Sequence, residues 1–289
     1  MDLYDNLKRG ERGAWISIFT YIALAVMKLI VGTLTGSEAL RADGLNNTTD
    51  VVVSVAVLIG LKISRKPPDQ NHHYGHMRAE SIATLIAAFI MTVVAIQVLV
   101  QAGSVLLEGG AAEPPTILAG WVAILSAGIM FVVYRYNLNL SKSINSSSLF
   151  AAAQDNRADA LVSIGASIGI FGSIAGFSWL DPLAAFIVGA IILKTAITIF
   201  KDAIHTLTDG FDRGEVDTIT ESIHDIPGIR SIQDIKGRSH GNIIFIDLTI
   251  TVDPNLNVIE SHDITEKIEQ KVKQNHPYCQ VHVHIEPDL

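Results

Sequence analysis

Residues 37–63 read SEALRADGLNNTTDVVVSVAVLIGLKI. This stretch is long enough to cross a bilayer, which takes about 20 mainly apolar residues, yet it carries polar side chains. Asn46 and Asp50 are four residues apart and therefore share one face of a helix. An ionised Asp at mid-membrane costs about 3 kcal/mol unless a partner compensates its charge. The stretch therefore predicts a membrane-spanning helix with a functional polar pair.

A second hydrophobic stretch, residues 149–176, repeats this arrangement with Asp155 and Asp159. Two helices that each offer two oxygen ligands at helical spacing indicate the two halves of one cation site. Carboxylate and amide oxygens are hard ligands that suit Mn²⁺, Mg²⁺ or Ca²⁺ better than Zn²⁺. Three carboxylates carry more negative charge than a divalent ion neutralises, so metal release can be coupled to proton uptake. The alternative is that these carboxylates cap helices or pair with the cations of Lys28, Arg41 or Arg157.

The composition is that of a membrane protein with a water-exposed part. Only 17% of the 289 residues are charged, and the formal net charge of -8 argues against a nucleic-acid partner. The single cysteine, Cys279, excludes an internal disulfide and a multi-cysteine metal cluster. The sequence contains no zinc-protease or serine-hydrolase motif, so we expect neither an enzyme nor a cofactor.

Hydrophobic segments predict a multi-pass protein of the cell membrane. We expect six spans, at residues 14–34, 37–63, 79–107, 116–136, 149–176 and 181–205. Basic residues concentrate before the first span, between the second and third, and between the fourth and fifth, whereas the alternate loops have none. By the positive-inside rule, both termini face the cytoplasm. Lys28 and Lys194 lie within spans and are expected to snorkel to the interface or to pair with a carboxylate.

The pattern changes after residue 208. An amphipathic helix, two alternating strands, a charged helix and a last strand predict a small α+β domain of order α-β-β-α-β. We therefore expect a transmembrane domain at residues 1–208 and a cytoplasmic domain at residues 209–289. A domain of this size buries a modest core, so dimerisation would help to stabilise it.

Two further clusters have the residue types of metal sites. In the loop before the third span, His72 and His76 have ligand spacing and Asp69 is near them in sequence. Nitrogen ligands make this loop a better Zn²⁺ site than the membrane pairs are. The alternative is a solvated polar loop.

The other cluster lies in the C-terminal domain. His282 and His284 alternate on one strand face that Glu286 continues, while Asp247 and His262 lie on the preceding strand and helix. These side chains are candidates for a metal site, and the alternative is ordinary surface polarity.

Four motifs together resemble the cation diffusion facilitators: ADGLNNTTD, NHHYGHMRAES, DNRADALVS and the closing VHVHIEP. The resemblance covers nearly the whole chain. It implies a homodimeric metal–proton antiporter with six transmembrane helices and a cytoplasmic metallochaperone-like domain. It also implies a transport site at Asn46, Asp50, Asp155 and Asp159. Zinc-transporting members usually have His in one of these pairs, and the departure seen here is associated with manganese.

The same resemblance assigns the loop ligands to Asp69, His72 and His76. It also implies that Arg78 and Asp209 form a charge pair at the cytoplasmic ends of the two membrane domains.

In the cytoplasmic domain the resemblance assigns metal ligands to Asp247, His262, His284 and, less closely, Glu286. A further ligand position of the family is occupied by Gln233 here, which indicates a weaker regulatory site for a divalent metal. Metal binding there is expected to pull the two domains of the dimer together.

The sequence thus predicts an exporter that exchanges Mn²⁺ for H⁺ across the lipid bilayer. The alternative within the family is export of Fe²⁺, Zn²⁺ or Co²⁺. The alternative outside transport is a membrane metal sensor or scaffold that moves no ion.

Overall fold

The structure is a computed structural model. It describes residues 3–35, 38–108, 117–177, 179–241, 243–276 and 278–288. The side chain of Asn46 lies outside this description, as do several others in the helices. The chain divides into two compact units, Met1–Ala203 and Ile204–Leu289.

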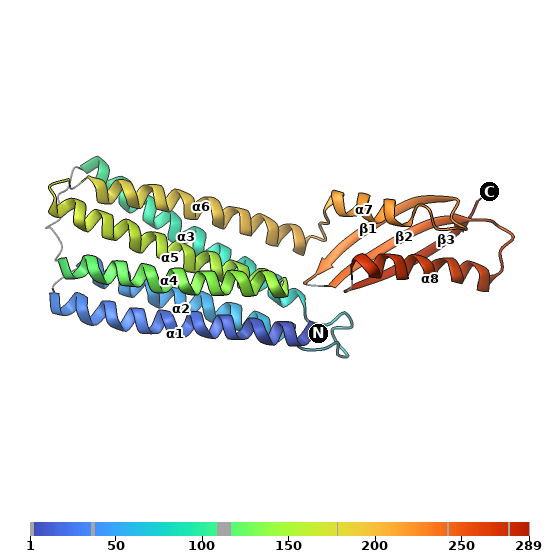
Figure 1. The fold of residues 1–289 in the computed structure, drawn as a ribbon, viewed down its shortest axis with the longest axis horizontal. Coiled ribbons are helices and arrows are strands. Elements are labelled where there is room, and N and C mark those ends of the chain that lie inside the picture. The colour runs from blue at the N-terminus through green and yellow to red at the C-terminus, as the bar shows by residue number, and fades with distance from the viewer. Residues whose placement is uncertain are drawn as a thin grey trace. The chain divides into compact units, whose positions relative to one another are not determined.

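The predicted spans correspond to long helices (Figure 1). These are α1 (Leu3–Thr35), α2 (Glu38–Ser64), α3 (Arg78–Glu108), α4 (Ile117–Ile144), α5 (Ser147–Ile174) and α6 (Leu180–Leu207). The segments Asn6–Val31, Arg78–Leu107 and Ile117–Ile144 are long and apolar enough to cross a membrane. The fourth helix runs on to Ile144, beyond the predicted end at residue 136, because a polar continuation can stay helical outside the apolar slab.

Within this bundle α1 packs against α2 and α4, and α5 packs against α3 and α4. Small side chains fill the helix contacts. Gly60 in α2 lies where a Cβ would come within 2.3 Å of the Cβ of Ala83 in α3, so only glycine permits this approach. Large apolar side chains point outward instead, as Phe89 and Trp121 do at 59% and 60% exposure. An apolar exterior around a polar interior is the arrangement expected of helices in lipid.

The second unit has the predicted order α-β-β-α-β (Figure 1). Its elements are α7 (Arg213–Ile223), β1 (Ser231–His240), β2 (Ile243–Val252), α8 (Val258–Asn275) and β3 (Cys279–Pro287). The sheet order is β1-β2-β3, with β1 antiparallel and β3 parallel to β2. The parallel pair requires a crossover, which α8 provides.

One face of this sheet forms the core. Ile246, Leu248 and Ile250 alternate along β2, and Ile264 and Ile268 meet them from α8. Helix α8 begins with a capping box, in which Asn257 and Glu260 bond each other's backbone N–H groups. Helices α7 and α8 both cover this face. The side chains at the alternate positions of β2 and β3 therefore lie on the other face of the sheet, which we call the open face.

Candidate metal-transport centre

Three buried carboxylates from two helices meet inside the bundle. Asp50 in α2 and Asp155 and Asp159 in α5 each place one oxygen so that the three lie within 4.8 Å of one another. All three residues are less than 9% exposed. The structure therefore brings together three of the four residues predicted for the transport site. The fourth, Asn46, lies outside the described side chains, and metal binding by the set stays a prediction.

Helical spacing explains why Asp155 and Asp159 lie close together. Asp155 and Asp159 are one turn apart, so their side chains project from the same face of α5. Ala151, Ala152 and Ala153 are fully buried one turn earlier, and such small residues allow helices to approach closely. Close packing of these helices agrees with the burial of the three carboxylates.

A third helix contributes Tyr21, which the sequence reasoning missed. Its ring is fully buried, its hydroxyl donates a hydrogen bond to Asp159, and the oxygen lies 3.3 Å from Oδ2 of Asp155. Nδ2 of Asn156 donates to the same hydroxyl at 3.0 Å. The phenol thus bridges the two carboxylates of α5. One sequence feature could have indicated this contact. Tyr21 carries a hydroxyl inside an apolar span, and the hydroxyl of a buried Tyr usually has a hydrogen-bond partner.

Behind Tyr21, a buried polar network joins three helices. Nδ2 of Asn137 in α4 donates to Oγ of Ser17 in α1 and to Oδ1 of Asn156 in α5, both at 2.8 Å. Ser17 donates to the same Asn156 oxygen at 3.2 Å. Buried amides without partners cost free energy, so these bonds fix how α1, α4 and α5 pack around the carboxylates.

Lys28 in α1 does not snorkel. It is 1% exposed, and its Nζ donates to Oδ1 of Asn47 at 2.8 Å. Nδ2 of Asn47 in turn donates to Oδ2 of Asp50 at 3.1 Å. Lys194, in contrast, is exposed on α6. The two lysines therefore differ, and only Lys28 is connected to the carboxylates through described contacts.

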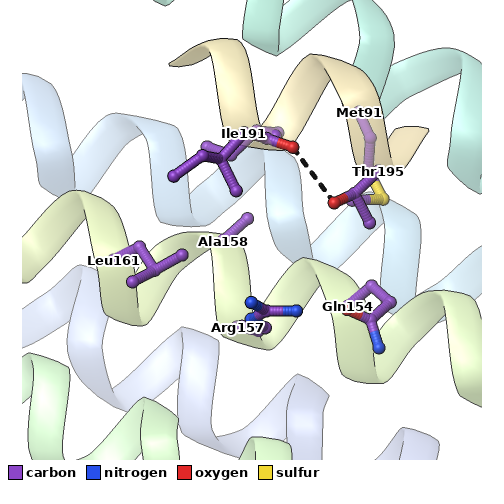
Figure 2. A pocket seen from close by; sticks show the side chains of 8 residues that line it. Met91, Gln154, Arg157, Ala158, Leu161, Ile191 and Thr195 are labelled. Atoms are coloured by element: carbon purple, nitrogen blue, oxygen red, sulfur yellow. Dashed lines mark hydrogen bonds between the residues drawn. The ribbon is translucent and has the colours of Figure 1, made fainter. Parts of the chain in front are cut away.

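A small cavity lies on the other side of α5, between α3 and α6 (Figure 2). Met91, Gln154, Arg157 and Thr195 are among the residues that line it. Its volume of about 10 Å³ is about that of a single water site. It is too small to serve as a second substrate chamber.

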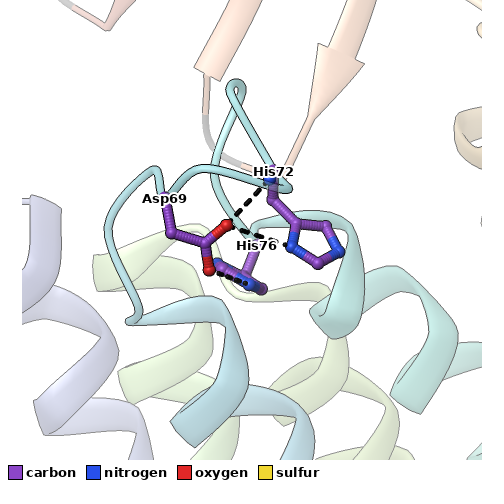
Figure 3. Close-up of side chains that lie close together, drawn as sticks. All are labelled: Asp69, His72 and His76. Carbon is purple, nitrogen blue, oxygen red and sulfur yellow. Dashed lines mark hydrogen bonds and ion pairs between the residues drawn. The ribbon is translucent and has the colours of Figure 1, made fainter.

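The loop between α2 and α3 brings its three predicted ligands together (Figure 3). Oδ1 of Asp69 lies 3.3 Å from Nδ1 of His72, and Oδ2 lies 3.4 Å from Nε2 of His76. The backbone N–H groups of Asn71 and His72 donate to Asp69 and hold the pKa of its carboxyl below the ordinary value. An ionised carboxylate between two imidazoles has the donor set of a zinc site.

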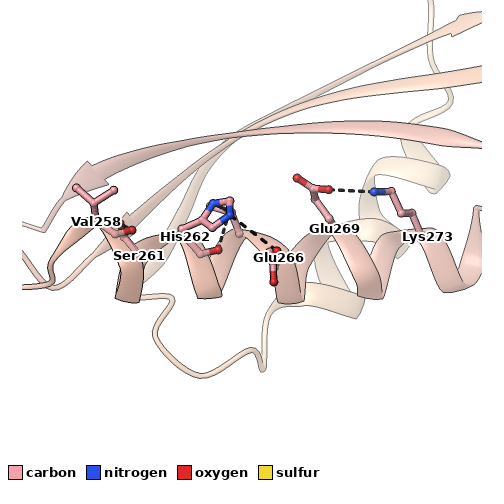
Figure 4. Close-up of polar contacts among 7 residues, drawn as sticks. Val258, Ser261, His262, Glu266, Glu269 and Lys273 are labelled. Atoms are coloured by element: carbon pink, nitrogen blue, oxygen red, sulfur yellow. Dashed lines mark hydrogen bonds and ion pairs between the residues drawn. The ribbon is translucent and has the colours of Figure 1, made fainter.

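The predicted ligands of the second unit lie on two sides of its sheet. Asp247 on β2 and His282 on β3 are neighbours in the strand register. On the same open face, Nε2 of His284 lies 3.7 Å from Oε1 of Glu286. His262 projects from α8, which covers the opposite face, and lies 3.8 Å from Glu266 (Figure 4). Among the described residues of this unit, no three such ligands come within reach of one another. Metal binding by His262 and the strand ligands stays a prediction.

Two more predicted positions have defined places. Gln233 lies at the irregularity of β1, where the register shifts between Ile232 and Asp234. Arg78 is the first residue of α3, and Asp209 belongs to the second unit, where it adopts a positive φ of 60°. The charge pair of Arg78 and Asp209, expected at the cytoplasmic ends of the two membrane domains, stays a prediction.

Comparison with known proteins identifies the family. The family model of the cation efflux transmembrane domain matches residues 14–208, and that of the cytoplasmic domain of cation efflux proteins matches residues 211–288.

Similarity to individual relatives extends over nearly the whole chain. The manganese efflux system protein MneS of Bacillus subtilis (strain 168) is 50% identical over 287 residues, which is 99% of each chain. MneP of the same organism is 30% identical and covers 96% of each chain. The magnetosome protein MamB of Magnetospirillum gryphiswaldense is also 30% identical, over 93% of this chain and 91% of its own. The resemblance found in the motifs is thus confirmed, and the chain belongs to the cation efflux family of membrane transporters rather than to any enzyme family.

Proposed function

We propose that this protein exports Mn²⁺ across the cell membrane in exchange for protons. The observation that carries the proposal is the convergence of Asp50, Asp155 and Asp159 in the interior of the bundle. Two relatives named as manganese efflux systems, at 50% and 30% identity, support both export and this ion. With the predicted amide of Asn46, the site offers only oxygen ligands, which favour Mn²⁺ over Zn²⁺.

Proton coupling follows from the charge of the site. Buried carboxylates this close to one another cannot all remain ionised without a compensating cation, because their mutual repulsion is strong in a low dielectric. When the metal leaves, a proton can take part of its place. Exchange of metal for protons at one site is the simplest cycle that keeps these carboxylates compensated.

The remaining assignments belong to the same proposal. We place a multi-pass transmembrane domain at residues 1–208 and a cytoplasmic domain at residues 209–289, with both termini in the cytoplasm. The match to the cytoplasmic domain of cation efflux proteins and the modest size of its core support a homodimer. The charge pair of Arg78 and Asp209 would tie the membrane domains together at their cytoplasmic ends.

Two accessory sites complete the scheme. Asp69, His72 and His76 would hold a divalent metal in the loop, since they already lie at ligand distance. Asp247, His284 and Glu286 share the open face of the sheet, and His262 lies behind it. A regulatory site that uses all four would therefore need ligands from both protomers of a dimer.

Transport by purified protein tests this proposal. Reconstituted vesicles with an imposed pH gradient should take up Mn²⁺ in preference to Zn²⁺ and Fe²⁺. Asn46→His should raise Zn²⁺ transport relative to Mn²⁺, because imidazole is a better zinc ligand than an amide oxygen. If Mn²⁺ fails to compete with the other two ions in the wild type, the assigned substrate is wrong.

A further inference from the structure

We infer that Lys28 and Asn47 form a positioning unit that orients Asp50 and sets the charge of the transport site for a divalent ion. The inference rests on the proposed function and deepens it. Its residues come from α1 and α2, whereas the carboxylates come from α2 and α5. The unit thus couples a third helix to the ion through described hydrogen bonds.

The lysine fixes the orientation of the Asn47 amide. An ammonium group only donates, so the atom of Asn47 at 2.8 Å from Nζ of Lys28 must be the carbonyl oxygen. The amide NH₂ group is then the one directed at Asp50, whose Oδ2 lies 3.1 Å away. Asn47 is three residues before Asp50 on α2, the spacing at which helical side chains meet. Lys28 therefore orients the Asn47 amide so that its NH₂ group donates a hydrogen bond to Asp50.

The lysine also changes the charge of the cluster. Three carboxylates and one ammonium give the described group a formal charge of -2 when all are ionised. A divalent cation cancels this charge, whereas a monovalent ion leaves one negative charge uncompensated. In a buried site, residual charge is costly because water cannot screen it. Among the described residues, this charge therefore matches a divalent ion better than a monovalent one.

A structural role alone explains the lysine less well. A basic side chain within a membrane span is costly, and a lysine that only packed could reach the interface by snorkelling. Lys28 is instead 1% exposed and is directed at the residue beside a predicted ligand. This position agrees with a role in which the Lys28 ammonium acts on the carboxylate cluster inside the bundle.

Equilibrium Mn²⁺ binding to the full-length protein in detergent, with initial uptake rates in vesicles, tests the inference. Lys28→Met and Asn47→Ala should each raise the Kd and KM for Mn²⁺ by about tenfold or more, the loss expected for a charge-assisted hydrogen bond. The double variant should be no worse than the weaker-binding single variant, because both act on Asp50 by one route. Lys194→Met, which removes an exposed lysine from another helix, should leave both constants unchanged.

Three outcomes would overturn the inference: wild-type Kd in Lys28→Met, additive losses in the double variant, or equal losses in Lys28→Met and the charge-conserving Lys28→Arg. Should Lys28→Met fail to give monodisperse protein, Asn47→Ala and Lys28→Arg carry the same test. Asp50→Ala separates the two proposals. If it abolishes transport while Lys28→Met behaves as wild type, only the positioning role fails, whereas wild-type transport by Asp50→Ala removes the transport site itself.

Discussion

The hydroxyl oxygen of Tyr21 in α1 lies 3.3 Å from Oδ2 of Asp155 in α5, and both residues are buried. The same hydroxyl donates to Asp159. A single phenol thus lies beside two carboxylates that repel each other in a low-dielectric interior, and its one O–H donates to Asp159. Helix α1 therefore contributes a side chain to the proposed transport site, although it supplies none of the predicted ligands.

Removal of this hydroxyl should weaken metal binding without unfolding the bundle. A hydrogen bond to a charged group contributes about 1.5–3 kcal/mol, so Tyr21→Phe should raise the KM for Mn²⁺ by about tenfold or more. Vesicle uptake as a function of Mn²⁺ concentration measures the change. Tyr134→Phe, at a partly buried Tyr of α4, is the matched control and should keep the wild-type KM. An unchanged KM in Tyr21→Phe would show that the phenol does not orient the carboxylates.

Loss of one carboxylate separates an exporter from a sensor or scaffold. Asp159→Ala should abolish Mn²⁺ efflux, because it removes a proposed ligand and the carboxylate that accepts the hydrogen bond of Tyr21. Cells that express the variant should accumulate Mn²⁺ to the level of cells without the protein. Asp217→Ala, in the exposed surface of α7, should retain efflux. Retained efflux in Asp159→Ala would favour the non-transporting alternative.

Glu80 connects α3 to the start of α5. It is 1% exposed, accepts a hydrogen bond from Oγ of Ser146, and lies 3.3 Å from the backbone nitrogen of Ser148. Glu80→Ala leaves these donors without a partner and should destabilise the protein by about 1–3 kcal/mol. Thermal unfolding in detergent should show a lowered Tm. Glu80→Gln keeps an acceptor and should lose less, and equal losses in both variants would contradict this account.

The loop carboxylate gives a pH-dependent prediction. The lowered pKa of Asp69 means that its ionised form stabilises the folded loop above the unfolded pKa of about 3.9, and that this contribution is lost as pH falls through the lower native value. At neutral pH, Asp69→Asn should therefore speed amide hydrogen exchange at Asn71 and His72. Gln70→Ala should not. Unchanged exchange of these two amides in Asp69→Asn would mean that the carboxylate does not hold the loop.

Much of this molecule could be predicted from residue patterns. Long apolar stretches and the alternation of β2 and β3 are local signals, so the helices and the α-β-β-α-β order followed from them. The pairing of Asp155 with Asp159 was visible as helical spacing, and the pairing of Asp69 with His72 as loop proximity. The sequence also predicted that the polar pairs of α2 and α5 lie close together. The structure supports this for Asp50, whose carboxylate lies beside those of Asp155 and Asp159.

Other features depend on packing that local patterns do not record. Spacing along α1 shows that Tyr21 and Lys28 lie in a span, but not which helices they face. Asn137 contacts Asn156 only because α4 packs against α5. The placement of His262 away from Asp247 depends on which face of the sheet α8 covers.

The most direct test of the central claim is Mn²⁺ uptake into vesicles that contain the purified protein, under an imposed pH gradient, for wild type and Asp50→Ala. Three converging carboxylates predict saturable uptake in the wild type, which collapses when the gradient is removed, and background uptake in Asp50→Ala. Gradient-driven uptake by Asp50→Ala at the wild-type rate and KM would contradict the claim that Asp50, Asp155 and Asp159 bind the transported ion.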